Sequence, residues 1–265
     1  MMLNYVKLVF FAGVLIFSAS VARAEITATP QPYMDRKDHM MGVVVADPTW
    51  TGERPLVVMF PDWMGPSSET EQEARRIAAL GYKVFIADMY GVGIRPTIVE
   101  EASNLSGFYK SKRSAMLFRA QAALENARAL PGVKKSSVAT IGYCFGGTVG
   151  LELALSGADV TGTVSVHGGL DSPNLNKAGD IKGRVLILHG ADDPFVPETE
   201  IGALENEFKT GKVKYELVKY LGAVHAFTNE GADKLNLKGA AYNADADKQA
   251  FAAMEKFLGE LFAVK

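Results

Sequence analysis

The sequence predicts a single α/β domain with a mostly parallel central sheet and helices on both of its faces. Short, continuously apolar runs such as residues 55–60 and 183–190 are typical of strands buried on both sides. Amphipathic helical patterns separate these runs, and this alternation favours crossover connections between parallel strands. The chain has 265 residues, of which 48% are hydrophobic and 22% are charged, and this composition suits one globular domain with a sizeable core.

The expected elements follow in regular order. A lead-in with one strand at residues 41–46 precedes the strand at 55–60 and a helix over 67–81, which opens with serines and acids and ends on Gly81. Residues 94–109 are expected to form a long connection that shapes substrate entry. The remaining strands are expected within 82–91, 137–143, 160–169, 183–190 and 214–222, and the remaining helices within 106–132, 146–157, 197–211 and 241–263.

Residues 1–24 have the composition of a secretory signal peptide. Lys7 precedes an apolar stretch, and Ala22 and Ala24 have the small side chains and the spacing that a signal peptidase recognises. The stretch is shorter than the roughly 20 residues that span a bilayer, so cleavage after Ala24 is expected rather than an uncleaved anchor. The sequence thus predicts a periplasmic or secreted protein in which residues 25–265 form one domain, with no stable membrane anchor after cleavage.

The charge balance argues against a polyanionic partner. The chain contains 28 basic and 30 acidic residues, a formal net charge of −2, so no nucleic-acid partner is expected. Loss of Lys7 and Arg23 with the leader leaves 26 basic and 30 acidic residues, a formal charge of −4. No cofactor is expected, and the sequence does not predict the oligomeric state.

Cys144, the only cysteine of the chain, lies in the sequence GYCFG between an expected strand and a helical pattern. This is the arrangement of a nucleophile elbow, in which a sharp turn exposes the central side chain at the start of a helix. Gly142 and Gly146 suit it because larger side chains would collide with the neighbouring strand and helix. The positive end of the helix favours a thiolate, and the N–H of Phe145 becomes an oxyanion donor. The alternative is a small buried cysteine beside a tight turn.

Acid and base candidates follow in the order nucleophile, acid, histidine, which is the order of the α/β-hydrolases. Asp193 comes just after the strand at 183–190, and His225 comes just after the last strand. His225 can take the thiol proton, and a carboxylate can hold its ring in the useful tautomer. Asp193 is preferred because DPFVP fits the loop of the acid, and Asp192 is the alternative. The pattern predicts the α/β-hydrolase fold, with the site at the carboxyl ends of the strands.

The other three histidines have simpler interpretations. His39 precedes the core and is expected on the surface, His189 is expected to make structural hydrogen bonds, and His167 is expected to line the cleft. A non-enzymatic alternative is a periplasmic protein that binds a soft metal such as Cu(I) through DHMM beside His39. Most of the ten methionines lie in apolar segments, where methionine fills the core, so no metal site is expected.

From about residue 33 to residue 262 the chain resembles the dienelactone hydrolase family of α/β-hydrolases. The most specific matches are GYCFGG, DPFVP and GAVHAF, supported by MFPDWMG, ADMYG, SVHGGL and the late segment HAFTN…AYNADAD. The resemblance implies a catalytic triad of Cys144, His225 and Asp193. It also implies a second oxyanion donor, the N–H of Trp63.

The resemblance further implies a set of substrate-lining residues. Tyr90 and Tyr109 fall where family members have tyrosines near the substrate. Family members usually have a glutamate that contacts the resting cysteine; here the position is Asp62, one methylene shorter, which leaves its reach to Cys144 open. Asn229 stands where members that bind an anionic dienelactone have an arginine. Loss of this carboxylate clamp argues against dienelactone as the physiological substrate, and so does the export signal.

The expected function is hydrolysis of a carboxylic ester, lactone or thioester through an acyl-enzyme on Cys144. The expected partner is a small-molecule ester or lactone, whose acyl group the sequence does not identify. An acyl or thioester transferase on the same triad is the alternative among enzymes. A redox-sensing thiol would need a resolving cysteine, which the chain lacks.

Overall fold

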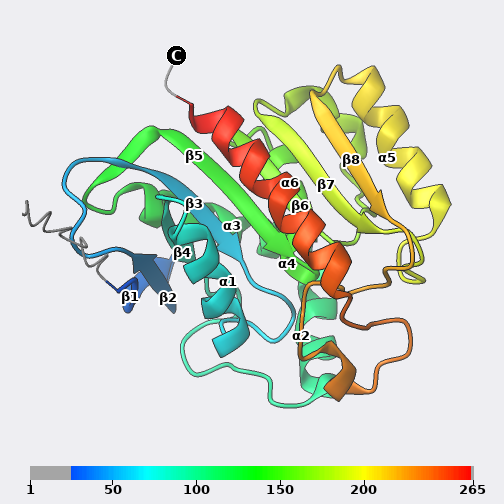
Figure 1. The fold of residues 1–265 in the computed structure, drawn as a ribbon, viewed down its shortest axis with the longest axis horizontal. Helices are drawn as coiled ribbons and strands as arrows, with labels where there is room; N and C mark the ends of the chain where they lie inside the picture. Colours follow the sequence, from blue (N-terminus) through cyan, green and yellow to red (C-terminus); the bar gives the residue numbers. More distant parts are fainter. Residues whose placement is uncertain (1–24, 264–265) are drawn as a thin grey trace, which may run out of the picture.

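The computed structural model describes residues 25–263, which form an eight-stranded sheet flanked by helices (Figure 1). The expected leader at residues 1–24 lies outside the described residues. The strand order is β1-β2-β4-β3-β5-β6-β7-β8; β2 pairs antiparallel with β1 and β4, and the other pairings are parallel. This confirms the predicted fold class. The strands are β1 (Thr27–Asp35), β2 (Asp38–Ala46), β3 (Arg54–Phe60), β4 (Lys83–Ile86), β5 (Val133–Tyr143), β6 (Gly162–Val166), β7 (Arg184–Gly190) and β8 (Tyr215–Tyr220).

Helices cover both faces of the sheet, and the alternation of side chains along β3 divides the core between them. Val57 and Met59 face α1 and α6, which lie in front of the sheet in Figure 1, whereas Leu56 and Phe60 face α3 and α4. Burial on both sides explains the continuous hydrophobicity of these strands. The helices are α1 (Ser68–Ala78), α2 (Val99–Ser111), α3 (Arg113–Arg128), α4 (Phe145–Leu155), α5 (Glu198–Thr210) and α6 (Ala244–Phe262), with short 3₁₀ turns η1 (Leu175–Asp180) and η2 (Ala232–Leu235).

The lead-in contains two strands where the sequence predicts one. β1 and β2 form an antiparallel hairpin that turns at Arg36, which has a positive φ of 54°. β1 is the edge strand, carries Pro30 and Pro32, and exposes most of its side chains. Such a strand has no apolar run, because prolines and polar residues are typical of sheet edges.

The helix expected over 106–132 is divided at Lys112. This residue has φ −118° and ψ 64°, and it separates α2 from α3. α2 begins at Val99, so most of the expected long connection is helical. Its residues Val99, Ser106 and Lys110 line the cavity described below, a position that suits the expected influence on substrate entry.

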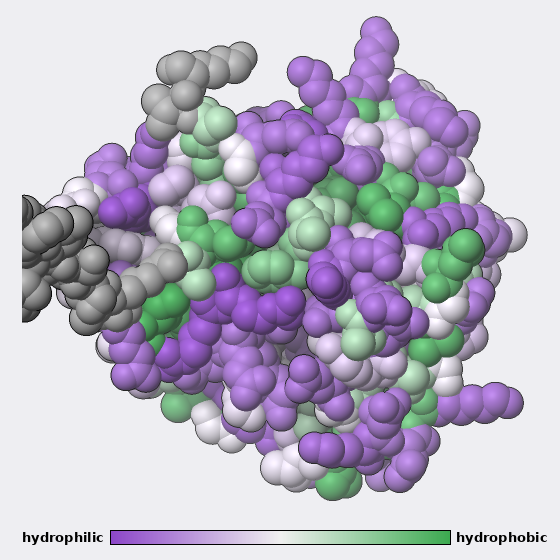
Figure 2. Space-filling view, in the orientation of Figure 1, coloured by the Kyte–Doolittle hydropathy of each residue, from purple (hydrophilic) through white to green (hydrophobic). Residues whose placement is uncertain are grey.

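The surface of the molecule is mainly polar on the face shown in Figure 2, with hydrophobic side chains scattered between the hydrophilic ones. Within residues 25–263, no helix combines the length and the hydrophobicity that crossing a membrane requires.

Candidate active site

The predicted nucleophile elbow lies between β5 and α4. Cys144 has φ 51° and ψ −115°, a strained conformation for a residue with a side chain. A Cβ on Gly142 would overlap the backbone of Gly146, and a Cβ on Gly146 would overlap the carbonyl oxygen of Phe60. Glycine at both positions therefore permits the turn that leaves Cys144 partly exposed at the start of α4.

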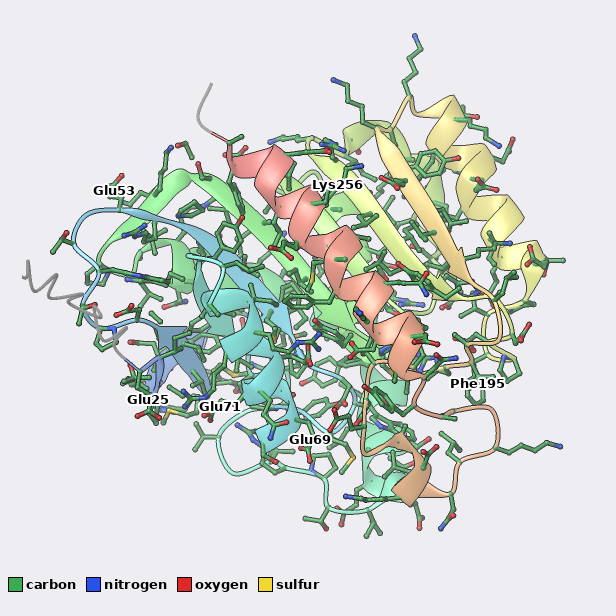
Figure 3. All side chains as sticks on the ribbon, viewed as in Figure 1. Glu25, Glu53, Glu69, Glu71, Phe195 and Lys256 are labelled. Atoms are coloured by element: carbon green, nitrogen blue, oxygen red, sulfur yellow. The ribbon has the colours of Figure 1, made fainter. Side chains whose placement is uncertain are left out.

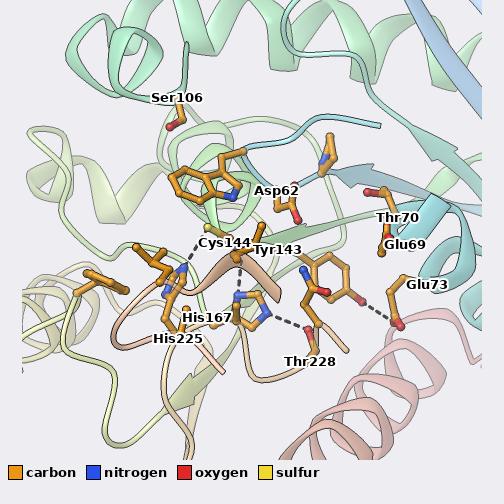
Figure 4. A pocket seen from close by; sticks show the side chains of 18 of the residues that line it. Asp62, Glu69, Thr70, Glu73, Ser106, Tyr143, Cys144, His167, His225 and Thr228 are labelled. Atoms are coloured by element: carbon orange, nitrogen blue, oxygen red, sulfur yellow. Dashed lines mark hydrogen bonds between the residues drawn. The ribbon is translucent and has the colours of Figure 1, made fainter. Parts of the chain in front are cut away.

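The loops after β7 and β8 bring an acid and a histidine to Cys144. His225 Nε2 lies 3.0 Å from the Sγ of Cys144 (Figure 4), and His225 Nδ1 lies 2.8 Å from Asp193 Oδ2. The other oxygen, Oδ1, accepts a hydrogen bond of 2.8 Å from the N–H of Phe195. Asp193 is buried, whereas Asp192 is exposed. The structure thus places Asp193, and not Asp192, against the histidine.

The charges of this group are strongly coupled. Burial lowers the pKa of His225, but the charge of Cys144 and the hydrogen bond with Asp193 outweigh burial and raise the pKa to about 10. The ring is therefore protonated at neutral pH. Its Nε2–H can donate a hydrogen bond to the Cys144 sulfur 3.0 Å away.

A cavity of about 660 Å³ opens over Cys144, and its wall contains Asp62, Trp63, His167 and Asn229 from the sequence prediction. All of them come from loops at the carboxyl ends of strands or from the segment after β8. Glu69 at the start of α1 and Phe195 after β7 also line it, and both are labelled in Figure 3. The ring of Phe195 stands edge-on to His225, with 5.3 Å between ring centroids.

Tyr90 and Tyr109 lie behind the wall and are not among the residues that line this cavity within the described chain. The Tyr90 hydroxyl donates to the carbonyl oxygen of Trp63 at 2.8 Å, and its ring stacks on Phe145 with centroids 6.0 Å apart. Tyr109 packs against Tyr90 and accepts a hydrogen bond from Arg119 at 3.4 Å. Both tyrosines therefore support the segments that contain Trp63 and Phe145, the two expected oxyanion donors. A sequence pattern does not distinguish a tyrosine that supports the cavity wall from one that lines the cavity.

Asp62 lies on the side of Cys144 opposite His225 (Figure 4). Its Oδ1 accepts a hydrogen bond of 2.8 Å from the N–H of Met64, and among the described residues it makes no hydrogen bond to Cys144. Burial raises the pKa of Asp62 to about 6, against the opposing effect of the Met64 hydrogen bond. Asp62 is thus hydrogen-bonded to the backbone of its own loop.

The sequence patterns did not indicate two features of the site. Thr228 lines the cavity and hydrogen-bonds His167, although it lies in the quoted segment HAFTN. The cavity also has an acidic wall, which the spacing of Glu69 and Glu73 on one helix face could have indicated. The acidic lining residues are Asp62, Glu69, Glu73, Asp171, Glu230 and Asp247. In residues 25–263 no three His, Cys, Asp or Glu side chains are grouped so as to hold a metal ion.

Comparison with known proteins agrees with this geometry. Residues 41–262 match the model of the dienelactone hydrolase family. The chain belongs to that family. It is similar to a putative carboxymethylenebutenolidase from Synechocystis sp., with 25% identity over 78% of this chain and 86% of the relative. The family assignment makes the protein a hydrolase of the ester or lactone type and confirms the resemblance that the motifs suggested.

Two solved structures are similar over nearly the whole domain. The first is a dienelactone hydrolase-like promiscuous phosphotriesterase, P91, from metagenomic libraries, with 37% identity, a TM-score of 0.85 and coverage of 89% of this chain and 98% of that chain. The second, m3DLH, has 35% identity, a TM-score of 0.85 and coverage of 89% and 99%. The fold of this family member is therefore that of the dienelactone hydrolases.

Proposed function

We propose that this dienelactone hydrolase family member cleaves uncharged carboxylic esters or lactones through an acyl-enzyme on Cys144. The observation that carries the proposal is the hydrogen-bonded chain from Asp193 through His225 to the sulfur, at the floor of a 660 Å³ cavity. The order and spacing of these groups are those of a nucleophile with its base and the group that orients the base.

Acylation begins when the thiolate of Cys144 attacks the carbonyl carbon and the C=O electron pair moves to oxygen. The N–H groups of Phe145 and Trp63 donate to this oxyanion, and the Tyr90 hydroxyl holds the Trp63 peptide in place. His225 gives its proton to the leaving oxygen as the C–O bond breaks. Loss of one oxyanion donor costs roughly 100-fold or more in rate.

Deacylation uses the same groups in reverse. His225, now neutral, takes a proton from water, and the resulting hydroxide attacks the thioester carbonyl. The thiolate leaves, and the carboxylic acid departs; from a lactone the product is a hydroxy acid. Phe195, 47% exposed beside His225, gives the leaving group an apolar surface.

The charge of the cavity supports an uncharged substrate. Six carboxylates line the wall, against the cations Arg76 and Lys110 and the protonated His225. Arg76 pairs with Glu73 at 2.7 Å and Asp247 at 3.3 Å, and Arg113 pairs with Asp171 at 2.6 Å, so these charges largely cancel. The acidic character of the wall then comes mainly from Asp62, Glu69 and Glu230. At 8 Å and an effective dielectric constant of 20, each of these three carboxylates, when ionised, repels a substrate anion by roughly 2 kcal/mol before screening. A carboxylate-bearing lactone is therefore disfavoured.

The test is hydrolysis of a panel of activated esters and lactones, which includes one lactone both as a free carboxylate and as its neutral methyl ester. We expect turnover of the neutral compounds, a preference for the methyl ester that weakens at high salt, and loss of activity in Cys144→Ala and His225→Ala. His39→Ala, on the exposed side of β2, is the matched control. Full activity in Cys144→Ala would refute the mechanism, and a preference for the free carboxylate would refute the substrate class.

An acyl or thioester transferase would form the same acyl-enzyme and differ only in the acceptor. Product analysis with water and competing alcohol or thiol acceptors separates the two. We expect the carboxylic acid to remain the main product, because His225 can activate a water molecule in the cavity without a second substrate. Transfer products in excess over the acid would support the transferase.

Neutral phosphotriesters are a second candidate substrate class. The similar structure P91 is described as a promiscuous phosphotriesterase, and a cavity with an acidic wall suits a neutral triester better than an anion. Release of the aryl alcohol from an aryl dialkyl phosphate, absent in Cys144→Ala, would support this activity. No release, or equal release in the variant, would exclude it.

For the cellular location, we propose that residues 1–24 direct export and are removed. The leader composition supports this, as does the continuous domain that starts directly after it. Mass spectrometry of protein from a bacterial periplasmic fraction should give Glu25 as the first residue. Full-length protein confined to the cytoplasm would contradict the proposal.

A further inference from the structure

His167 is a buried residue at the carboxyl end of β6, and its ring reaches the cavity. It has a positive φ of 40°, which is uncommon for a residue with a side chain. Its backbone N–H donates to the carbonyl oxygen of Leu188 at 2.8 Å, which anchors the turn to β7. The anchored backbone therefore fixes the direction of the ring.

The ring connects the nucleophile elbow to the histidine loop, as the dashed lines in Figure 4 show. The backbone N–H of Cys144 donates to Nδ1 of His167 at 3.2 Å, in addition to the carbonyl oxygen of Val166 at 3.0 Å. Because a backbone N–H only donates, Nδ1 is the acceptor and Nε2 carries the proton of the neutral ring. Nε2 lies 2.9 Å from Thr228 Oγ1 and donates to it.

Thr228 belongs to the short turn that presents His225. The N–H of Asn229 closes this turn on the carbonyl oxygen of Ala226 at 2.9 Å, and Ala226 has a positive φ of 57°. Thr228 is buried, and its hydroxyl is hydrogen-bonded to the ring of His167. A shift of Thr228 would move His225, three residues earlier, relative to the sulfur.

The surroundings keep His167 neutral. Burial and the nearby His225, whose ring centroid is 5.4 Å away, lower the pKa of His167 well below its usual range. A protonated ring would place an N–H against the N–H of Cys144 and a second cation beside the imidazolium. The neutral ring instead gives one fixed acceptor toward the elbow and one fixed donor toward Thr228.

We propose that His167 and Thr228 are positioning residues that hold His225 at reacting distance from Cys144 by bridging the loops of these two groups. The inference rests on the proposed function. Asp193 orients the histidine ring from a third loop, whereas the bridge connects the elbow and the histidine turn directly. A displacement of about 1 Å between reacting groups can lower the rate on the order of 100-fold.

The test compares Thr228→Val, which removes only the hydroxyl, with Thr228→Ser, which keeps it. For Thr228→Val we expect kcat to fall about tenfold or more with KM unchanged, and for Thr228→Ser we expect kcat within about threefold of wild type. Alkylation of Cys144 by iodoacetamide should slow in parallel in the valine variant alone. Because both residues act through one bridge, adding Thr228→Val to His167→Phe should cause no further loss.

The possible outcomes distinguish a failure of the proposed His167–Thr228 bridge from a failure of the proposed acyl-enzyme mechanism. Wild-type kcat in Thr228→Val, a loss confined to KM, or equal impairment in Thr228→Ser would overturn the positioning role. Activity that persists in Cys144→Ala, measured in the same assay, would overturn the proposed function instead. If His167→Phe fails to fold, as its thermal unfolding will show, the two Thr228 variants decide alone.

Discussion

Replacement of Asp193 by asparagine should inactivate the enzyme by holding His225 as a neutral ring in the unproductive tautomer. In the wild type, Oδ1 accepts from the N–H of Phe195 at 2.8 Å, and Oδ2 faces Nδ1 of the histidine at 2.8 Å. The asparagine oxygen will stay with the Phe195 N–H, so its NH₂ group will point at Nδ1 and donate to it. The histidine proton then lies on Nε2, which can no longer accept the thiol proton of Cys144.

The size of the effect follows from the cost of restoring the productive tautomer. The side chain at position 193 is fully buried, and turning the amide over would place its NH₂ group against the N–H of Phe195, so that neither donor has an acceptor, at about 1–3 kcal/mol for each group left unsatisfied. Two such groups cost about 2–6 kcal/mol, and the carboxylate charge that stabilises the imidazolium is lost as well. We therefore expect kcat/KM to fall about 10³–10⁴-fold, equivalent to about 4–5.5 kcal/mol.

The assay is steady-state hydrolysis of the best neutral ester, with Asp192→Asn as the matched control. Asp192 is the adjacent acid, is exposed, and contributes its backbone N–H to Ala223, so its substitution should leave kcat/KM within about twofold. Alkylation of Cys144 at neutral pH should slow in Asp193→Asn and not in the control. The reasoning is refuted if Asp193→Asn retains more than about a tenth of wild-type kcat/KM, or if both variants lose activity equally.

Three further predictions concern stability. Gly146→Ala should lower the melting temperature sharply, because the added Cβ would overlap the carbonyl oxygen of Phe60. Gly202 is the matched control: it is a helical position with open space around it, so Gly202→Ala should raise the free energy of unfolding by about 0.5–1 kcal/mol. Equal effects of the two substitutions on the melting temperature would contradict this prediction. Asp62→Asn should stabilise the fold at pH 8 and not at pH 4, since a pKa raised to about 6 makes the ionised form costly above that pH. His225, with a pKa of about 10 against 6.5, stabilises the fold fully below pH 6.5. Melting temperatures should therefore fall through pH 10 more in wild type than in His225→Ala.

The sharp turn at Cys144 and the meeting of Cys144, Asp193 and His225 could be predicted because each rests on local chemistry. Cys144 between close-packed glycines, and Asp193 and His225 just past strands, are short patterns whose meaning does not depend on distant contacts. Parallel strands end at one edge of the sheet, so residues in these loops meet there. The preference for Asp193 over Asp192 likewise came from the turn sequence DPFVP.

The rest depends on contacts that no local pattern encodes. Tyr109 was expected at the substrate, but packing of α2 places it behind the wall beside Tyr90. No glycine or proline marks the break between α2 and α3 at Lys112, so the helical pattern of the sequence continues across it. β1 has an exposed edge and two prolines in place of an apolar run. Thr228 meets His167 only because the turn after β6 and the segment after β8 come together at the site.

The most direct test of the account is intact-protein mass spectrometry after rapid quenching of the enzyme with an activated ester. We predict a mass increase of one acyl group, removed by hydroxylamine and mapped by peptide digestion to the peptide that contains Cys144. The adduct should be absent in Cys144→Ala. Turnover with no adduct in the wild type under quench conditions that preserve thioesters, or an adduct on another residue, would contradict the cysteine nucleophile.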